Sequence, residues 1–252
     1  MTTNYYLQKE AAHFRNLWEL GPTDPVRLSS LILKLNTIVV FKQLSTKFSG
    51  MCYKVNDYSF MLINSAHPIG RQNFTICHEL YHIYVQTDFA IHSCIIEGFD
   101  KKNKTEYAAD LFASFFLLPE DGVIGLIPEN ELKKNKITLQ TILKIEQYYR
   151  CSRSALLYRL DNLGLISIAD YEDYRFDVTK NARSYGYDTA LYHPGRRGHV
   201  YGEYGVIAKK LYDSEKISES HYLSLLKDIG IDIDDENNGE EGNLSEKNSI
   251  GR

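Results

Sequence analysis

Apolar residues recur at helical spacing at the start of the chain, and the period then changes to that of strands. The second predicted helix shows the pattern well, because Leu28, Leu31 and Leu35 lie on one face. Asp24 followed by Pro25 is typical of a helix start, with Asp24 as the N-cap. Beyond it, β-branched and aromatic residues favour strands. The predicted elements are helices over 5–20 and 25–35, strands over 37–41, 51–55 and 58–63, and a tight turn at 56–57.

The remainder of the chain is predicted to be mainly helical. Two long helices, over 71–85 and 104–118, flank an irregular segment at 86–103. Shorter helices are expected over 138–149, 152–162, 203–213 and 219–228, and 166–200 is Tyr- and Gly-rich with little periodicity. From residue 232 onward the sequence is acidic and poor in large apolar residues, which predicts a disordered tail.

Composition excludes some classes of protein. The 252 residues carry a net charge of -4, so a globally basic nucleic-acid binder is not expected. No apolar run approaches the roughly 20 residues that span a bilayer, and the N-terminus does not read as a secretory signal. The expectation is a cytoplasmic protein without membrane contact. Its four cysteines form no CxxC pair, so free and mostly buried thiols are expected.

The sequence HELYH at 78–82 is an HExxH motif on the first long helix. His78 and His82 are one turn apart and point the same way, so both imidazoles can bind one metal ion. Glu79 lies about 100° round the helix, beside the ion, where a general base must lie to deprotonate metal-bound water. The motif therefore predicts a catalytic zinc site.

A catalytic zinc ion needs a third protein ligand and an open position for water. Glu106, early in the second long helix, is the best candidate, and Glu97 is its rival. Asp110 lies one turn after Glu106 on the same face. It is therefore placed to accept the free ring N–H of a zinc-bound histidine.

Three segments together resemble the ImmA/IrrE family of zinc metallopeptidases. They are RQNFTICHELYH at 71–82, EYAADLFA at 106–113 and LLP at 117–119. The resemblance implies that His78, His82 and Glu106 bind Zn²⁺ and that Glu79 is the catalytic base. It also implies a minimal thermolysin-like (gluzincin) fold, in which a small twisted sheet packs on the two metal-binding helices.

The resemblance also implies a biological role. Members of the family typically cleave a helix-turn-helix transcriptional repressor encoded beside them, and so relieve repression of a mobile-element, stress-response or phage-defence locus. The expected α+β chain then has four parts. They are a zinc metallopeptidase domain at 1–120, a helical, helix-turn-helix-like region at 121–165, a Tyr/Gly-rich and helical segment at 166–231 and the tail at 232–252. Substrate is expected to bind as an added strand, with the strand at 58–63 as the sheet edge.

Two further features allow a functional or an ordinary interpretation. Cys94, between the motif and Glu106, is either an inhibitory zinc ligand in the water position or an ordinary thiol. The stretch 131–165 has seven Lys/Arg against three Asp/Glu. Arg153 and Arg159 in it either contact phosphates of a regulatory nucleic acid or belong to a helical pair that caps the core.

Three functions remain in competition. The leading hypothesis is an endopeptidase specific for a repressor. The alternative from the binding class is a DNA-binding or antitoxin-like module with a structural metal, although structural zinc sites are commonly richer in cysteine. A peptidase of broad specificity ranks last, because no acidic anchor for a substrate amine is evident. Tyr81, Tyr84 and His92 are the nearby options for an oxyanion donor.

Overall fold

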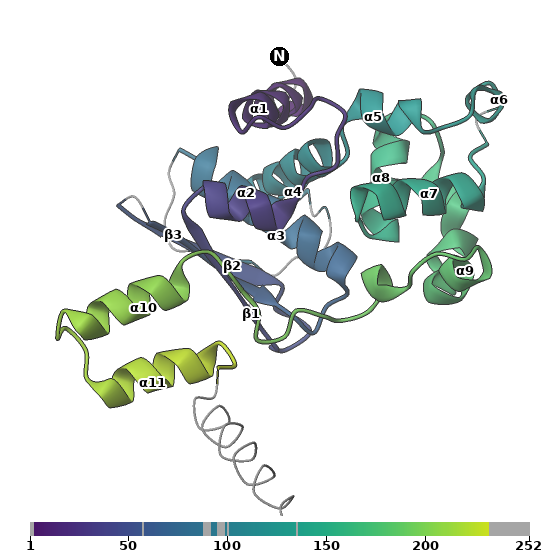
Figure 1. The fold of residues 1–252 in the computed structure, drawn as a ribbon. Coiled ribbons are helices and arrows are strands. Elements are labelled where there is room, and N and C mark those ends of the chain that lie inside the picture. The colour runs from purple at the N-terminus through teal and green to yellow at the C-terminus, as the bar shows by residue number, and fades with distance from the viewer. Residues whose placement is uncertain are drawn as a thin grey trace, which may run out of the picture.

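The computed structural model describes residues 3–56, 58–87, 92–94, 99, 101–134 and 136–231, and the predicted tail at 232–252 lies outside them. The described part is a mixed α+β fold (Figure 1). Its longer helices are α1 (Thr3–Leu17), α3 (Ile69–Tyr84), α4 (Lys104–Leu117), α7 (Leu139–Tyr149), α8 (Arg153–Asn162), α10 (Tyr204–Asp213) and α11 (Glu219–Asp228). None of the described helices is both long enough and apolar enough to cross a membrane.

The shorter elements connect these helices. They are α2 (Leu28–Lys34), α5 (Glu120–Gly125), α6 (Glu129–Leu132), α9 (Val178–Ser184) and the 3-10 helices η1 (Ile168–Arg175) and η2 (Ala190–Tyr192). The segment 166–200, which shows little periodicity in the sequence, therefore contains η1, α9 and η2. Short helices of this kind are too brief to leave a periodic apolar pattern.

One five-stranded sheet lies at the centre, with the strand order β4-β2-β3-β1-β5. The strands are β1 (Thr37–Lys42), β2 (Gly50–Val55), β3 (Tyr58–Asn64), β4 (His92–Cys94) and β5 (Val200–Tyr201). The strands β1 and β3 pair in parallel, and the other pairs are antiparallel. The three predicted strands are therefore confirmed within one or two residues, and Val55 pairs with Tyr58 on the two sides of the position predicted for the turn.

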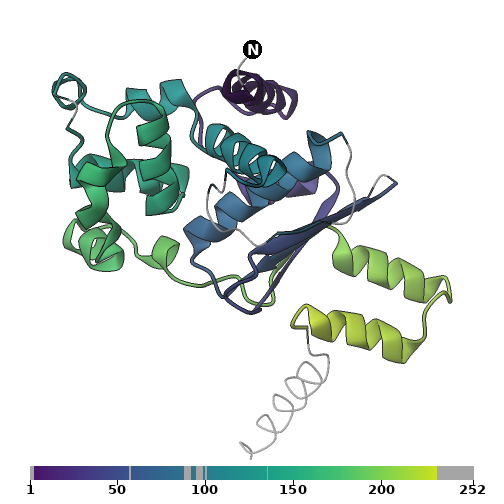
Figure 2. The same cartoon turned by 180° about the vertical axis from the view of Figure 1, so that it is seen from behind.

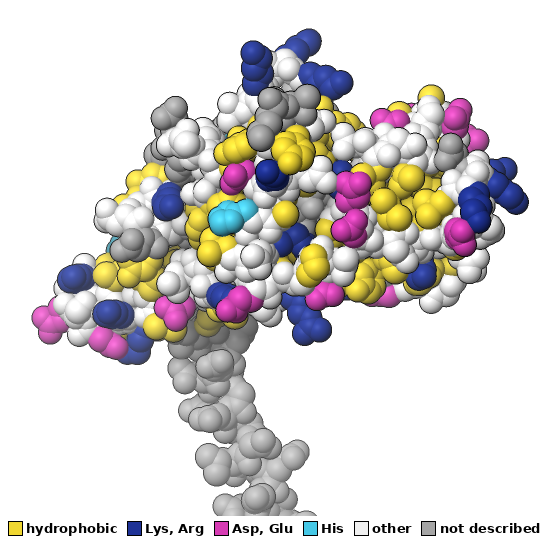
Figure 3. Space-filling model, turned by 90° about the horizontal axis from the view of Figure 1, so that it is seen from above, with side chains coloured by type: hydrophobic (Ala, Val, Ile, Leu, Met, Phe, Trp, Pro, Cys, Tyr) yellow, Lys and Arg dark blue, Asp and Glu magenta, His cyan; other side chains and the backbone are white. Residues whose placement is uncertain are grey.

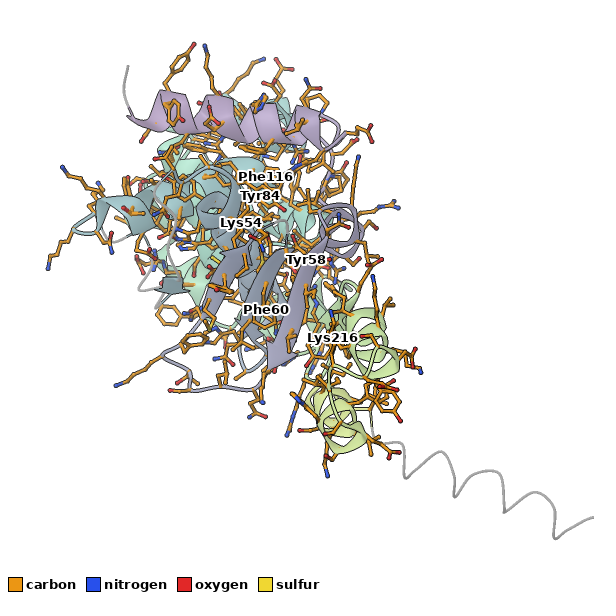
Figure 4. All side chains as sticks on the ribbon, turned by 90° about the vertical axis from the view of Figure 1, so that its left-hand side faces the viewer. Lys54, Tyr58, Phe60, Tyr84, Phe116 and Lys216 are labelled. Atoms are coloured by element: carbon orange, nitrogen blue, oxygen red, sulfur yellow. The ribbon has the colours of Figure 1, made fainter. Side chains whose placement is uncertain are left out.

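Helices cover one face of this sheet. In Figures 1 and 2, α3 lies against the strands and α4 lies beside it, with α1 outermost. An aromatic cluster joins these layers, because the Trp18 ring of the segment after α1 lies 5.4 Å from the rings of both Tyr84 and Phe116. Lys54 of β2 lies over the Tyr84 ring from the sheet side (Figure 4). This core holds α3 and α4, which carry the candidate site, in place relative to the sheet and to α1.

The remaining helices lie at two ends of the molecule. The helices α5 to α9 gather at one end, and the α10–α11 hairpin projects from the other (Figures 1 and 2). The helices α7 and α8 begin at the residues expected, because Thr138 and Ser152 cap them through their side chains. Ser218 caps α11 in the same way.

Two expectations about the elements are wrong. The strand β3 is not the sheet edge, because it lies between β2 and β1, and the edges are β4 and β5. Asp24 is not the N-cap of α2, which begins at Leu28 after Arg27. The Arg15 side chain donates to the carbonyl oxygens of Gly21 and Asp24 and so holds this segment as a loop.

Candidate metal centre

The helix α3 presents two buried imidazoles to one point. Pro68 is the N-cap residue of α3, and the helix runs without a break through the HExxH motif. His78 and His82 are 1 % and 0 % exposed, and their Nε2 atoms lie 3.1 Å apart. The predicted i, i+4 convergence of the two side chains is therefore present.

The helix α4 brings the carboxylate of Glu106 to the same point. The Asn103 side chain accepts from the backbone N–H groups of Thr105 and Glu106, which fixes the first turn of α4. Glu106 Oε2 lies 3.3 Å from Nε2 of His78, and Glu106 Oε1 lies 3.5 Å from Nε2 of His82. The helix α4 packs on α3, and its small residues Ala109 and Ala113 are fully buried.

These distances fit a tetrahedral cation site. Zinc bonds to His nitrogen and carboxylate oxygen are about 2.0–2.2 Å, so tetrahedral ligand atoms lie roughly 3.3 Å from one another. The two Nε2 atoms lie 3.1 Å apart, and each lies 3.3 or 3.5 Å from one of the two carboxylate oxygens of Glu106. Within the part of the chain that the structure describes, His78, His82 and Glu106 are the one group of His, Cys, Asp and Glu side chains that could hold a metal ion. Glu106 keeps 17 % of its side chain exposed, which opens the site to solvent.

Two hydrogen bonds orient the imidazoles. Nδ1 of His78 lies 2.9 Å from Oδ1 of Asp110, the contact expected from the spacing of Glu106 and Asp110. Nδ1 of His82 lies 2.6 Å from Oε1 of Gln86. With Nδ1–H donating to these acceptors, both Nε2 lone pairs face the common point. Three lone-pair donors at such distances repel one another unless a cation lies among them.

Glu79 lies between α3 and the sheet. Its side chain is 0 % exposed, next to His78 on the helix. On β2, the position that a Cβ atom of Gly50 would occupy is 3.0 Å from Oε1 of Glu79. A glycine at this position therefore leaves room for the carboxylate against the strand.

Residues 35–161 match the family model of peptidase M78, described as the IrrE N-terminal-like domain. The chain belongs to this family. The match, which covers half of the chain, agrees with the ImmA/IrrE resemblance carried by the three segments above and includes all the candidate ligands. A search of curated proteins finds no match to this M78 peptidase. The family assignment supports a metallopeptidase, and His78, His82 and Glu106 are a candidate site for a metal ion.

The predicted phosphate contacts of this M78 peptidase are wrong. Arg153 and Arg159 are 4 % and 1 % exposed, so a nucleic acid does not reach their guanidinium groups. Arg153 forms an ion pair with buried Glu146, and Arg159 donates from Nε to the carbonyl oxygen of Leu118. On the face seen in Figure 3, basic and acidic side chains of the described residues are interspersed. The helices α7 and α8 thus follow the second interpretation, in which α8 packs on α4.

The cysteines follow the expectation where the structure describes them. Cys52, Cys77 and Cys151 are buried, and burial raises the pKa of Cys77 to about 12. Cys94 lies in β4 with its backbone opposite Gly50, but its side chain lies outside the described residues, as does Glu97. Inhibition by Cys94 therefore stays a prediction.

Sequence reasoning does not identify two of the residues at the site. Gln86 follows the end of α3, and its i, i+4 spacing from His82 is the one signal that could have identified it. Gly50 gives no such signal, because only the packing of α3 on β2 shows why it must lack a side chain. Of the suggested oxyanion donors, Tyr84 is occupied by packing and by contacts with Thr37 and Leu35. The side chain of His92 lies outside the described residues.

Proposed function

We propose that this M78 peptidase is a zinc-dependent endopeptidase that cleaves a specific partner protein. The observation that carries the proposal is the convergence of His78, His82 and Glu106 at tetrahedral separations, beside the buried carboxylate of Glu79. Two imidazoles and a carboxylate are the usual protein ligands of one large class of catalytic zinc sites, which keep the fourth position open.

Each residue of the site has a distinct role in peptide hydrolysis. A zinc ion held by the three ligands would supply Lewis-acid activation of a water molecule and of the scissile carbonyl. Glu79 takes the proton from the attacking water and delivers it to the leaving amine. Asp110 and Gln86 hold the two imidazoles in the tautomer that leaves Nε2 free.

Substrate binds as a strand along β4 in this proposal. The strand β4 is the sheet edge next to β2, and Gly50 of β2 lies both opposite Cys94 and beside Glu79. A peptide added along β4, on the side away from β2, would lie two strand spacings, about 10 Å, from Gly50 and the general base beside it. The arrangement of edge strand, HExxH helix and glutamate helix supports a minimal thermolysin-like organisation.

The proposed substrate is a helix-turn-helix repressor encoded beside the peptidase, as the family resemblance implies. Its cleavage would relieve repression of a mobile-element, stress-response or phage-defence locus. A structural metal in a DNA-binding module is less consistent with the site. A closed structural site would not need a fully buried glutamate beside its ligands, and the two arginines suggested for phosphate contact are buried.

The test is cleavage of the neighbouring repressor by the purified full chain, followed by mass spectrometry of the products. We expect discrete fragments, loss of cleavage with a chelator and recovery with added zinc. Glu79→Gln should abolish cleavage and leave zinc bound, because the amide keeps the shape of the side chain and loses the base. His78→Ala should lose both. Cleavage by Glu79→Gln at the wild-type rate would refute the mechanism, and an intact repressor would refute the substrate.

A further inference from the structure

Phe99 has an unusual backbone conformation close to the metal ligands. Its φ angle is +48°, in the left-handed region that disfavours bulky side chains. Two rings hold its side chain in place. The Tyr158 ring stacks on it with a centroid distance of 3.3 Å and an angle of 12°, and the Phe74 ring of α3 meets it at 5.8 Å and 62°. A strained residue held by its neighbours often serves a nearby site.

The backbone of Phe99 contacts the residue that orients the first zinc ligand. Its N–H donates to Oδ2 of Asp110 at 2.8 Å. The other oxygen of the same carboxylate, Oδ1, lies 2.9 Å from Nδ1 of His78. Asp110 is 3 % exposed, so these two bonds fix its plane inside the protein. The left-handed conformation of Phe99 thus directs its N–H toward Asp110, the residue that orients His78.

Tyr158 belongs to α8, which is remote in sequence from both α3 and α4. Arg159, the next residue, anchors α8 to the end of α4 through the carbonyl oxygen of Leu118 at 3.0 Å. The Tyr158 hydroxyl lies 3.2 Å from the hydroxyl of Tyr107, the residue after Glu106. Burial raises the pKa of Tyr158, so its hydroxyl is neutral at physiological pH. Tyr158 is therefore held against α4 at two points, through the neighbouring Arg159 and through its own hydroxyl.

We propose that Tyr158 is a positioning residue for the metal centre, acting through the Phe99 stack and Asp110 on His78. The inference rests on the proposed metal site and goes beyond it. It gives α8, the second helix of the helix-turn-helix-like region, a task in the peptidase site. Removing the stack frees Phe99 to leave the left-handed conformation, and Asp110 then loses its second hydrogen bond. His78 becomes less well oriented, and zinc affinity falls.

The experiment measures zinc affinity by chelator competition with the full chain. Tyr158→Leu removes the stack and should weaken zinc binding about tenfold, the lower end of the range for the outer partners of metal ligands. Tyr158→Phe keeps the ring and should lose less than about threefold. Leu157→Ala, at a fully buried residue of the same helix, is the control for loss of stability alone and should leave the affinity unchanged. The Co²⁺ absorption spectrum should change in Tyr158→Leu and not in the control.

A double-mutant cycle tests the route from Tyr158 to His78. In the Asp110→Ala background, Tyr158→Leu should cost no further affinity, because its effect passes through that carboxylate. An equal loss in both backgrounds would overturn the inference, as would wild-type affinity in Tyr158→Leu. The proposed function has a different failure: a wild-type chain without zinc affinity refutes the metal site itself. If the wild type bound zinc and cleaved its substrate while Tyr158→Leu kept the wild-type zinc affinity, only the positioning role would be refuted.

Discussion

At the residue scale, α3 approaches the sheet closely at Gly50. A Cβ atom added there would lie 2.7 Å from Cγ2 of Thr75, 3.0 Å from Oε1 of Glu79 and 3.3 Å from the carbonyl oxygen of Leu62. Thr75 is fully buried and donates to the carbonyl oxygen of Arg71, so its methyl group has little room to move. The Glu79 carboxylate is the neighbour most able to shift.

We therefore predict that Gly50→Ala impairs catalysis more than metal binding. A displacement of the general base by a fraction of an ångström to 1 Å should lower kcat/KM about 10- to 100-fold. Zinc affinity, measured by chelator competition, should stay near that of the wild type. Gly125→Ala is the matched control, because no atom lies within 4 Å of its added Cβ. Equal activity of the two variants would show that Gly50 does not place Glu79.

Sequence reasoning succeeds at this scale where the chemistry is local. His78 and His82 are one helical turn apart, and so are Glu106 and Asp110, so helix geometry places the members of each pair on one face of their helix. It fails for Arg153 and Arg159, because the net charge of a segment does not show which charges a fold buries. Their partners, Glu146 and the carbonyl oxygen of Leu118, are visible only in the packed structure.

At the element scale, the pair of Glu146 and Arg153 joins α7 and α8 to the segment after them. Both side chains are buried, at 0 % and 4 % exposed. Arg153 also donates from Nη1 to the carbonyl oxygen of Tyr174, and the Tyr192 hydroxyl donates to Oε2 of Glu146. Burial raises the pKa of Glu146, and the hydrogen bond and charge of Arg153 oppose this. The carboxylate therefore depends on Arg153 to stay charged.

We predict that Arg153→Met lowers the free energy of unfolding by about 3–5 kcal/mol, because it leaves a buried carboxylate without its partner. Urea denaturation followed by circular dichroism measures the change. Arg175→Met is the control, since Arg175 forms an exposed i, i+3 pair with Glu172 that should be worth under about 1 kcal/mol. A similar cost for the two variants would contradict a structural role for the buried pair.

The loop before α3 contains a group that should make stability depend on pH. Burial lowers the pKa of His67, the hydrogen bond to the carbonyl oxygen of Thr46 opposes this, and the charge of Arg71 adds to the lowering. Nε2 of His67 contacts the carbonyl oxygen of Thr46 at 2.9 Å, whereas Nδ1 is buried with no hydrogen-bond partner among the described residues. Protonation would add an N–H at Nδ1 with no acceptor, so the folded state binds this proton less readily than the unfolded chain.

Stability should therefore fall as the pH decreases from the unfolded pKa, about 6.5, through the lower folded pKa. We predict that the wild type loses more stability between pH 7 and pH 5 than His67→Gln, by up to about 1.4 kcal/mol per pH unit. The glutamine amide can still donate to Thr46 but does not titrate. Urea denaturation of both proteins across this pH range measures the difference. Parallel pH curves would exclude His67 as the titrating group.

The order of the strands is the part of the fold that the sequence pattern does not contain. Alternating and β-branched residues predict β1, β2 and β3 within one or two residues of their bounds. Which strands become edges depends on β4 and β5, which have three and two residues and leave no pattern of their own. The expectation that β3 is the edge fails for this reason.

At the scale of the whole molecule, the segment 193–201 completes a sheet whose other strands come from much earlier in the sequence. It adds β5 to β1, and its backbone bonds to Phe41 from both Gly198 and His199. The backbone N–H of Ile69, the first residue of α3, donates to the carbonyl oxygen of His193 at 3.0 Å. In Figure 1 the same segment runs from α9 to α10 along the sheet. The family match ends at residue 161, so this closing segment lies outside it.

We predict that a chain ending at residue 161 is much less stable than one ending at residue 203. The shorter chain loses β5, which uncovers the polar backbone edge of β1, and it leaves Ile69 and the buried amide of Gln72 without the carbonyl oxygens of His193 and Gly195. The longer chain keeps these bonds and lacks only the projecting α10–α11 hairpin and the residues C-terminal to it. Thermal unfolding and chelator competition compare the two. The longer chain should bind zinc like the wild type, and the shorter one should aggregate or unfold at a clearly lower temperature. If both chains unfolded at the wild-type temperature with the same zinc affinity, residues 1–161 would be sufficient for the fold, and the segment 193–201 would not support the metal-binding helix.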